Sequence, residues 1–306
     1  MPYSDSILEI YFNWKQPVCF LSKGFEVCIL KALLKIRNPH SPIIMNDLFD
    51  NETKDELLSF QQRNEGFKPQ KGTFSATDPI LELQCAEGLK PNGMFDRLTF
   101  EALMVGLPPL LIRDYSITLI PQKTLHTCWV AATSMMTGED WDDIIKKTPD
   151  KSWIKRLPWN EGGFIEYNRL RWVKDELRLK TEAPFDGDKY AIDFARIHGF
   201  RLHTWDWNVD FLCAAIAKGP LLFSNSFVRK ITKEDKGEYE EGKDKSLNHA
   251  IVISGVISNY NQSGTFLRIH DPSPRSIGSI HWEDYDWLLT KRPSSLAFFF
   301  SRPSDF

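Results

Sequence analysis

The stretch "IPQKTLHTCWVAATSMM", residues 120–136, places a cysteine and a tryptophan at the start of an alanine-rich run. Its small apolar residues, preceded by Thr127, predict a helix over residues 127–137. Cys128 would then lie in the first turn, where unpaired backbone N–H groups and the helix dipole favour a thiolate. The competing interpretation is that Cys128 is one more small apolar residue of a core. The choice depends on whether the rest of the chain supplies a base.

Length and charge limit the possible classes of protein. A chain of 306 residues is long for one compact unit, so two domains are expected. The 38 basic and 41 acidic residues leave a formal net charge of −3, without a long run of one sign. This balance predicts no nucleic-acid partner and no binding to an anionic membrane.

Cysteine usage and the first residues indicate how the protein is made. The chain has an odd number of cysteines, five, at irregular spacing and without a CxxC pair, so neither a disulfide framework nor a zinc site is expected. We predict no metal and no cofactor. The opening "MPYSDSILEIYFNWKQP" lacks the basic and apolar regions of a Sec signal peptide, and no apolar run reaches the length of a membrane span. A secreted form would therefore need a dedicated export route.

A short pattern recurs in the first third of the chain. Residues 46–62 and 92–103 share a phenylalanine, a threonine four positions later and a leucine four positions after that. Residues 71–89 repeat the pattern with one position missing. Asn-Asp or Asn-Gly predicts a turn, the phenylalanine packs under the following helix, and Thr or Asp caps its first turn. The pattern predicts a small helical module.

This module resembles the three-helix peptidoglycan-binding domain over roughly residues 24–106. The family motif of turn, Phe and Thr followed by Leu-x-x-Phe-Gln is matched at Phe49, Thr53, Leu57, Phe60 and Gln61. The family usually has glycine after the phenylalanine, where this chain has aspartate. The resemblance implies the helical fold and leaves two roles open, peptidoglycan binding or a packing module that positions the second domain.

The sequence divides into an N-terminal segment (residues 1–23), the helical domain (24–107) and a larger C-terminal domain (108–306). Pro108 and Pro109 mark the joint, because proline cannot continue a helix. The larger domain shows helical patterns first and strand patterns later, which predicts an α+β fold with a largely antiparallel sheet. The expected helices are 127–137, 168–178 and 209–218; the expected strands are 219–224, 249–256, 265–270 and 295–301.

The base that Cys128 requires has a candidate far along the chain. "SLNHAIVISGV" offers His249 at the head of an apolar strand, and "FLRIHDPSP" offers Asp271 at the end of the next. Adjacent antiparallel strands can bring two such residues side by side, so that the carboxylate orients the imidazole. Gln122 is a neutral amide that could donate a hydrogen bond to an oxyanion together with the backbone N–H of Cys128.

The combination of Gln, five residues, Cys-Trp, then Asn-His-Ala and later Asp-Pro resembles the papain-like cysteine peptidases over about residues 117–289. It is closer to the bacterial type of secreted effectors and bacteriocin-processing enzymes, in which Asp is the third catalytic residue. The resemblance implies Cys128 as nucleophile, His249 as its partner and proton donor, Asp271 as orienter and Gln122 in the oxyanion hole. We assign Trp129 and Asn248 to substrate binding; Trp129 would also shield the site from water.

Other residues have simpler interpretations. His270 would point to the opposite face of its strand from Asp271 and is predicted to be structural. His126 is predicted to be a wall of the cleft, and Trp205 and Trp207 to be packing residues. The charged residues 228–248 predict a solvated loop, with a lid over the site as the alternative.

We therefore expect a cysteine protease, with two alternatives: a peptidoglycan amidase or endopeptidase, and a non-catalytic binding protein on a papain-like scaffold. The absence of a signal peptide and the thiol's need for reducing surroundings favour action in a target-cell cytoplasm after specialised secretion. The alternative location is the periplasm or cell wall. The expected partners are a protein substrate, a secretion-system component, and an immunity protein or inhibitor in the producer.

Overall fold

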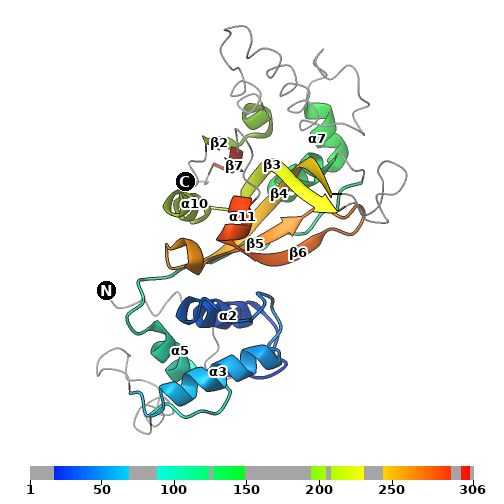
Figure 1. The fold of residues 1–306 in the computed structure, drawn as a ribbon. Helices are drawn as coiled ribbons and strands as arrows, with labels where there is room; N and C mark the ends of the chain where they lie inside the picture. Colours follow the sequence, from blue (N-terminus) through cyan, green and yellow to red (C-terminus); the bar gives the residue numbers. More distant parts are fainter. Residues whose placement is uncertain are drawn as a thin grey trace. The chain divides into compact units, whose positions relative to one another are not determined.

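The computed structural model describes residues 17–68, 88–123, 127–148, 194–204, 208–230, 244–290 and 298–303. Within these residues the protein combines helices with an antiparallel sheet, which confirms the predicted α+β class (Figure 1). None of the helices in this part of the chain is long and apolar enough to cross a membrane.

The chain divides into two compact units. The first comprises Met1–Leu111 together with Ile257–Phe266, and the second comprises Ile112–Val256 and Leu267–Phe306. The division near Leu111 lies close to the prolines that mark the predicted joint. The assignment of Ile257–Phe266 to the first unit was not anticipated, because nothing in the sequence of a strand hairpin indicates which unit its tip joins.

The first unit contains three described α-helices: α2 (Phe25–Arg37), α3 (Asn51–Arg63) and α5 (Arg97–Met104). Two of them begin with the same cap. Asp50 accepts the backbone N–H of Thr53 at 2.9 Å, and Asp96 accepts that of Thr99 at 2.8 Å. An N-cap carboxylate satisfies a backbone donor that the helix leaves unpaired, so the recurring Asp and Thr explain where both helices start.

Each capped turn is held by a buried polar side chain from the preceding helix. Lys31 of α2 is 0% exposed, and its Nζ donates to Asn46 Oδ1 at 2.7 Å and to Asp50 Oδ2 at 2.8 Å. Gln61 of α3, also 0% exposed, donates to Asn92 Oδ1 at 3.2 Å and accepts the backbone N–H of Gly93. The two predicted repeats therefore share one construction. Most of the predicted third copy, residues 71–89, lies outside the described residues.

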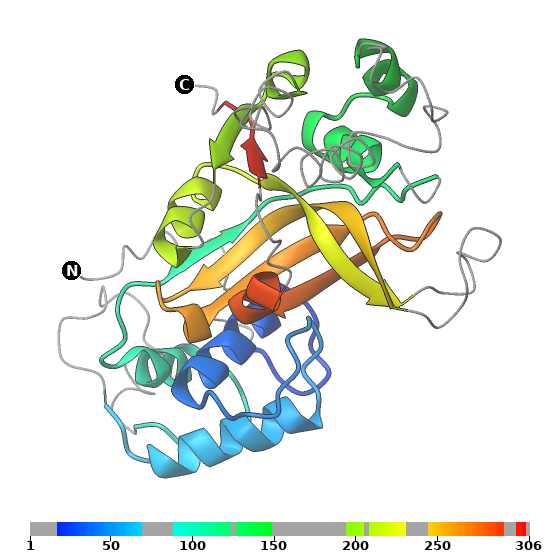
Figure 2. The same cartoon turned by 45° about the horizontal axis from the view of Figure 1, so that its top comes forward.

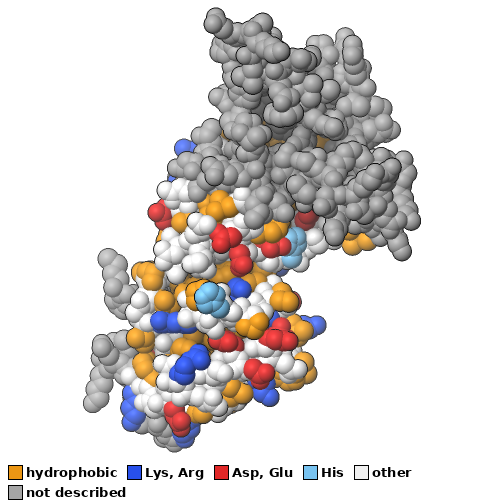
Figure 3. Space-filling view, in the orientation of Figure 1, with side chains coloured by type: hydrophobic (Ala, Val, Ile, Leu, Met, Phe, Trp, Pro, Cys, Tyr) orange, Lys and Arg blue, Asp and Glu red, His pale blue; other side chains and the backbone are white. Residues whose placement is uncertain are grey.

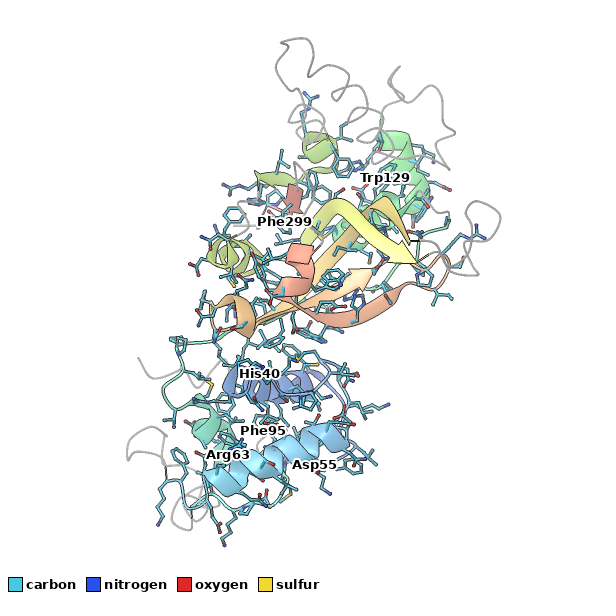
Figure 4. The ribbon with its side chains drawn as sticks, in the orientation of Figure 1. His40, Asp55, Arg63, Phe95, Trp129 and Phe299 are labelled. Atoms are coloured by element: carbon cyan, nitrogen blue, oxygen red, sulfur yellow. The ribbon has the colours of Figure 1, made fainter. Side chains whose placement is uncertain are left out.

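Apolar residues of the turns complete the core of this unit. Phe49 and Phe95 follow the two turns and are 0% and 1% exposed, and Figure 4 shows Phe95 directed into the interior between helices. The face of this unit in Figure 3 carries acidic and basic side chains interspersed with apolar ones. This mixed surface agrees with the near-neutral balance of the sequence.

The second unit is built on an antiparallel sheet that contains seven strands in the described part of the chain. Its strand order is β2-β7-β3-β4-β5-β6, and β1 pairs with β4. The strands are β1 (Leu111–Asp114), β2 (Arg201–Thr204), β3 (Leu221–Lys230), β4 (Asp244–Ser258), β5 (Thr265–Asp271), β6 (Ser279–Asp284) and β7 (Phe298–Ser301). Figure 2 shows the long central strands as one continuous twisted surface.

Strands β3 and β4 form a longer hairpin than the sequence predicted. They pair from Leu221 with Ile253 to Lys230 with Asp244, so both ends of the predicted charged loop, 228–230 and 244–248, are strand. That part of the loop prediction is wrong, because backbone pairing begun in the apolar part of a hairpin can continue through polar residues. Residues 231–243, the middle of that loop, lie outside the described residues.

Helix α6 (Cys128–Thr137) is buried along almost its whole length and confirms the helix predicted at 127–137. Gly138 ends it in the left-handed region, with φ of 71°, where a side chain would be strained. An all-apolar helix must be enclosed on every side. Its core cluster consists of Cys128, Trp129, Val130, Ala132, Met135, Met136, Ile144, Phe194, Ala195, Phe200, Leu222, Ala250, Val252 and Phe300.

The second unit also contains α7 (Trp141–Lys147), α10 (Val209–Ile216) and α11 (Tyr285–Thr290), with further helical residues at 194–198. The short 3-10 helix η2 (Gln262–Gly264) lies between β4 and β5, in the segment assigned to the first unit. Helix α10 matches the prediction at 209–218. The predicted helix at 168–178 lies outside the described residues. Sequence reasoning did not predict β2, β6 or α7, all short elements with weak periodicity.

Candidate active site

Cys128 is the first residue of α6. The backbone carbonyl of Thr127 accepts the N–H groups of Val130 at 3.1 Å and Ala131 at 3.2 Å, so the helix begins at the cysteine itself. At such a terminus the first N–H groups have no acceptor within the helix and can face an anion. The cysteine is also 1% exposed.

His249 and Asp271 lie on neighbouring strands. His249 is part of β4 and Asp271 ends β5, and the sheet order places these strands side by side. The Nε2 atom of His249 lies 2.5 Å from Oδ1 of Asp271. This contact uses Nε2, which leaves Nδ1 as the ring nitrogen available to the Cys128 side chain.

The electrostatics link all three side chains. Burial alone would lower the pKa of His249, but the Asp271 carboxylate and Cys128, through charge and hydrogen bonds, outweigh it and raise this pKa to about 10. The ring therefore stays an imidazolium at neutral pH. A cation beside sulfur stabilises negative charge there, which is the condition for an active thiolate nucleophile.

Asp271 is held by more than the histidine. Its Oδ1 also accepts the backbone N–H of Ser273 at 2.7 Å. Burial acts to raise the pKa of Asp271, but the charge and hydrogen bond of His249, the Ser273 N–H and the charge of His281 lower it overall. Sequence reasoning missed Ser273, although an Asp followed two residues later by Ser is a known turn signal. No feature of the sequence indicated that His281 would lie near enough to influence Asp271.

Gln122 is tied to the loop that follows Asp271. Its backbone N–H donates to the carbonyl of Pro272 at 2.9 Å, and its own carbonyl accepts the N–H of Ser276 at 2.9 Å. The residue is 1% exposed, and its Oε1 has no hydrogen-bond partner in the described part of the chain. A buried amide with an unused polar atom is unusual in a folded protein. The fold thus places Gln122 beside the loop that begins at the candidate orienter.

Of the two residues assigned to substrate binding, the structure describes the side chain of Trp129 but not that of Asn248. Trp129 is 1% exposed and meets Phe194 edge to face, with ring centroids 6.2 Å apart; Figure 4 labels it within the second unit. Trp129 is thus a member of the buried core cluster around α6, and its role in substrate binding stays a prediction. Asn248 belongs to β4, but its side chain lies outside what the structure describes, as do His126, Trp205 and Trp207.

His270 is separate from the catalytic candidates. It is 1% exposed, and both ring nitrogens lack a hydrogen-bond partner among the described residues. Burial first, and then the charges of Arg268 and His281, lower its pKa to about 4. The ring is therefore neutral at physiological pH. Among the described residues, no group of three or more His, Cys, Asp or Glu side chains has a metal-binding arrangement.

Comparisons with protein-family models, with curated proteins and with solved structures found no match to the chain.

Proposed function

We propose that the protein is a cysteine peptidase with a papain-like catalytic domain and a Cys128-His249-Asp271 triad. The observation that carries the proposal is the linked set of side chains: a cysteine at a helix N-terminus, an imidazolium coupled to it, and a carboxylate 2.5 Å from the far ring nitrogen. Buried cysteines of ordinary cores have no such partners.

The proposed reaction has two stages. The Cys128 thiolate attacks the scissile carbonyl carbon, and the carbonyl electrons move to oxygen, where the Gln122 amide and the backbone N–H of Cys128 stabilise the oxyanion. When the tetrahedral intermediate collapses, the C–N bond breaks and His249 donates its proton to the leaving amine. Water, deprotonated by the now neutral His249, then attacks the thioester and releases the acid, restoring thiolate and imidazolium.

We propose a protein as the substrate and the cytoplasm of a target cell as the place of action. A thiolate is preserved best in reducing surroundings, and four described cysteines, Cys19, Cys28, Cys128 and Cys213, are free thiols. An effector toxin that reaches a competitor or host by a specialised secretion system fits these conditions. Such an enzyme needs an immunity protein or inhibitor in the cell that makes it.

A second candidate function is peptidoglycan cleavage at the cell wall, by an amidase or endopeptidase. The observation that favours it is the repeated construction of the first unit, in which Lys31 and Gln61 hold two equivalent turns, because those turns carry the resemblance to peptidoglycan-binding domains. The same nucleophile would then attack an amide of the stem peptide.

The test compares the wild type with Cys128→Ala and Cys128→Ser. Each protein is incubated with a bacterial lysate, in which mass spectrometry identifies new protein N-termini, and separately with purified sacculi, in which released muropeptides are measured. The protease proposal expects new termini only with the wild type. Muropeptides without new protein termini would favour the wall enzyme. Activity that survives in Cys128→Ala would refute the assignment of Cys128 as the nucleophile. If the wild type acts on neither substrate, the result would favour the remaining alternative, a non-catalytic binding protein on a papain-like scaffold.

A further inference from the structure

Helix α2 of the first unit is enclosed on every side. Residues 27–34 are all buried, and a run of that length turns about twice around the helix axis. A helix without an exposed face needs cover from every direction. Within the first unit, α2 contacts α3, α5 and the 3-10 helix η2. Part of its cover therefore comes from the hairpin that joins β4 to β5, far from α2 in the sequence.

The hairpin tip, residues 257–266, is the part of this hairpin that belongs to the first unit. Two hydroxyls join its strands: Ser258 Oγ and Thr265 Oγ1 lie 2.6 Å apart. Thr265 Oγ1 donates to the carbonyl of Asn261 at 2.7 Å, so the Ser258 hydroxyl donates in the first bond, because each hydroxyl has one proton. Thr265 is buried. A buried polar network with its bonds made holds a segment in one arrangement.

The hairpin tip is also closely packed. Ile257 and Phe266, at its two ends, are both buried. A Cβ at Gly264 would overlap the side-chain amide of Asn259, and the Asn259 backbone N–H donates to the Gly264 carbonyl at 3.1 Å. Glycine permits this close approach because it has no Cβ. The tip is therefore a fixed block whose ends lie in the apolar interior.

A clamp holds the same strands where they lead into the hairpin tip. Arg268 Nη1 on β5 lies 2.5 Å from Asp114 Oδ1 on β1, and β4 pairs with both of these strands. Gly255 of β4 lies against this ion pair: a Cβ there would be 3.2 Å from Arg268 Cβ and 3.4 Å from Asp114 Oδ1. The three strands are therefore packed tightly together two residues before the tip begins.

The two strands that leave the hairpin tip carry the proposed catalytic pair. His249 is part of β4, and Asp271 ends β5. Packed, hydrogen-bonded strands are stiff, so a displacement at one end is carried towards the other. The contact between His249 Nε2 and Asp271 Oδ1 measures 2.5 Å, and a charge-assisted hydrogen bond this short weakens with a small change in distance or angle.

We propose that the β4–β5 hairpin is a positioning link, through which α2 of the first unit keeps His249 aligned with Asp271. The inference rests on the proposed peptidase function, since that function makes the pair catalytic. Of the two roles left open for the first unit, it supports the packing role: this unit holds the hairpin tip, and the tip sets the strands. Ser258 and Thr265 are then positioning residues for the pair.

The experiment uses the full chain with Thr265→Val, which keeps the shape of the side chain and removes the hydroxyl. Two properties are measured: kcat and KM on fluorescein-labelled casein, and the downfield proton NMR signal of the His249 Nε2–H group. A weakened tip should lower kcat by about tenfold with little change in KM, and should shift the signal upfield, as for a longer hydrogen bond. Thr265→Ser restores the hydroxyl and should recover both properties. Ser258→Ala should change both in the same direction as Thr265→Val.

Thr99→Val is the matched control. Thr99 is also a buried threonine of the first unit, and its hydroxyl donates to Asp96 Oδ1 at 2.7 Å, outside the hairpin tip. This variant should lower the melting temperature and leave kcat and the His249 signal at their wild-type values. All variants are compared at a temperature below the onset of unfolding.

The outcomes separate the link from the peptidase function. An unchanged His249 signal and kcat in both Thr265→Val and Ser258→Ala would overturn the link and leave the peptidase function standing. The same losses in Thr99→Val would also overturn the link, because they would follow from any destabilisation of the first unit. If the wild type makes no Cys128-dependent cut in casein or in the bacterial lysate, the peptidase function fails, while the His249 signal still tests the link.

Discussion

Asp271 Oδ1 and His249 Nε2 lie 2.5 Å apart, and the same oxygen accepts the backbone N–H of Ser273 at 2.7 Å. One carboxylate oxygen therefore orients the imidazole and fixes the turn that begins the next loop. Under the proposed function, the carboxylate acts on catalysis through the ring, and it acts on the fold of the loop through the turn.

Replacing Asp271 by asparagine should lower kcat by at least about 10²-fold, with a smaller change in KM. An amide cannot balance the imidazolium charge, and with its NH₂ toward Nε2 it would favour the wrong tautomer. Steady-state kinetics on a cleavable peptide measure the effect. Ser273→Ala is the matched control, because the Ser273 contact to Asp271 comes from the backbone and survives the change. A similar loss in both variants would contradict a specific role for the Asp271 charge.

Activity should persist far into the alkaline range. The imidazolium of His249 has a pKa raised to about 10, so the form that protonates the leaving amine is lost only near that pH. A profile of kcat/KM against pH, recorded from pH 5 to 11, should decline on its alkaline side near pH 10. A decline near pH 7 would contradict the proposed couple.

Stability should depend on the same ionisation. The folded-state pKa of His249 lies above its ordinary value of 6.5, so the stabilisation is fully present below pH 6.5 and is lost as the pH rises towards 10. Urea unfolding at a series of pH values should show this decline for the wild type. His249→Gln should remove most of it, since glutamine does not titrate.

Gln122→Ala should lower kcat by about 10²- to 10³-fold if the amide donates to the oxyanion. Gln122→Glu should be at least as impaired, because a carboxylate repels the developing negative charge. The backbone bonds from position 122 to Pro272 and Ser276 do not involve the side chain, so both variants should keep this loop. Because the side chain is buried, the new carboxylate of Gln122→Glu should lower the melting temperature, and kcat is compared at a temperature at which all three proteins are folded. Equal activity of all three proteins would exclude the oxyanion role.

Lys31→Met should destabilise the first unit by about 1–3 kcal/mol, because it removes the buried ammonium that donates to Asp50 and to Asn46. Denaturant unfolding measures the loss. Lys54→Met is the control: Lys54 is exposed and lies 5.5 Å from the ring of Phe20, so its loss should cost no more than about 1 kcal/mol. The loss of stability in Lys31→Gln should lie between those of Lys31→Met and Lys54→Met, since the glutamine Gln61 forms hydrogen bonds to the equivalent turn.

His270→Leu should raise stability by about 1 kcal/mol at pH 7, because it removes two buried nitrogens that have no partner in the described residues. The gain should grow below pH 6.5: the pKa of folded His270 is lowered to about 4, so acid favours the unfolded chain. Melting temperatures at pH 5 and 7 test both points. His40→Leu, at an exposed position (Figure 4), should show neither effect.

The sequence predicted those parts of the site that depend on local chemistry. The helix that begins at Cys128 follows from its small apolar residues, and the neighbouring strands of His249 and Asp271 follow from two apolar runs joined by a short turn. The proximity of β6 to Asp271 could not be predicted, because Ser279–Asp284 has weak alternation and its pairing is set by tertiary contacts.

The sequence pattern also did not predict which individual side chains are buried. Trp129 follows the cysteine directly, and neither its burial nor its edge-to-face contact with Phe194 could be predicted from that position in the sequence. The role of Lys31 was hidden for another reason. A lysine in a helix usually lies in solvent, and only the turn at Asn46 and Asp50, which is separated from it in sequence, supplies the acceptors that let it be buried.

The order of synthesis decides when the hydrogen bonds between Gln122 and the loop from Pro272 to Ser276 can form. The helix of Cys128 leaves the ribosome long before His249, Asp271 and this loop, and the contacts that assemble the site form only after β5 has been made. A growing chain therefore carries its thiol without base, orienter or anchored amide. Under the proposed function, the cell that makes this protein meets the active enzyme only after β5 and this loop have been made.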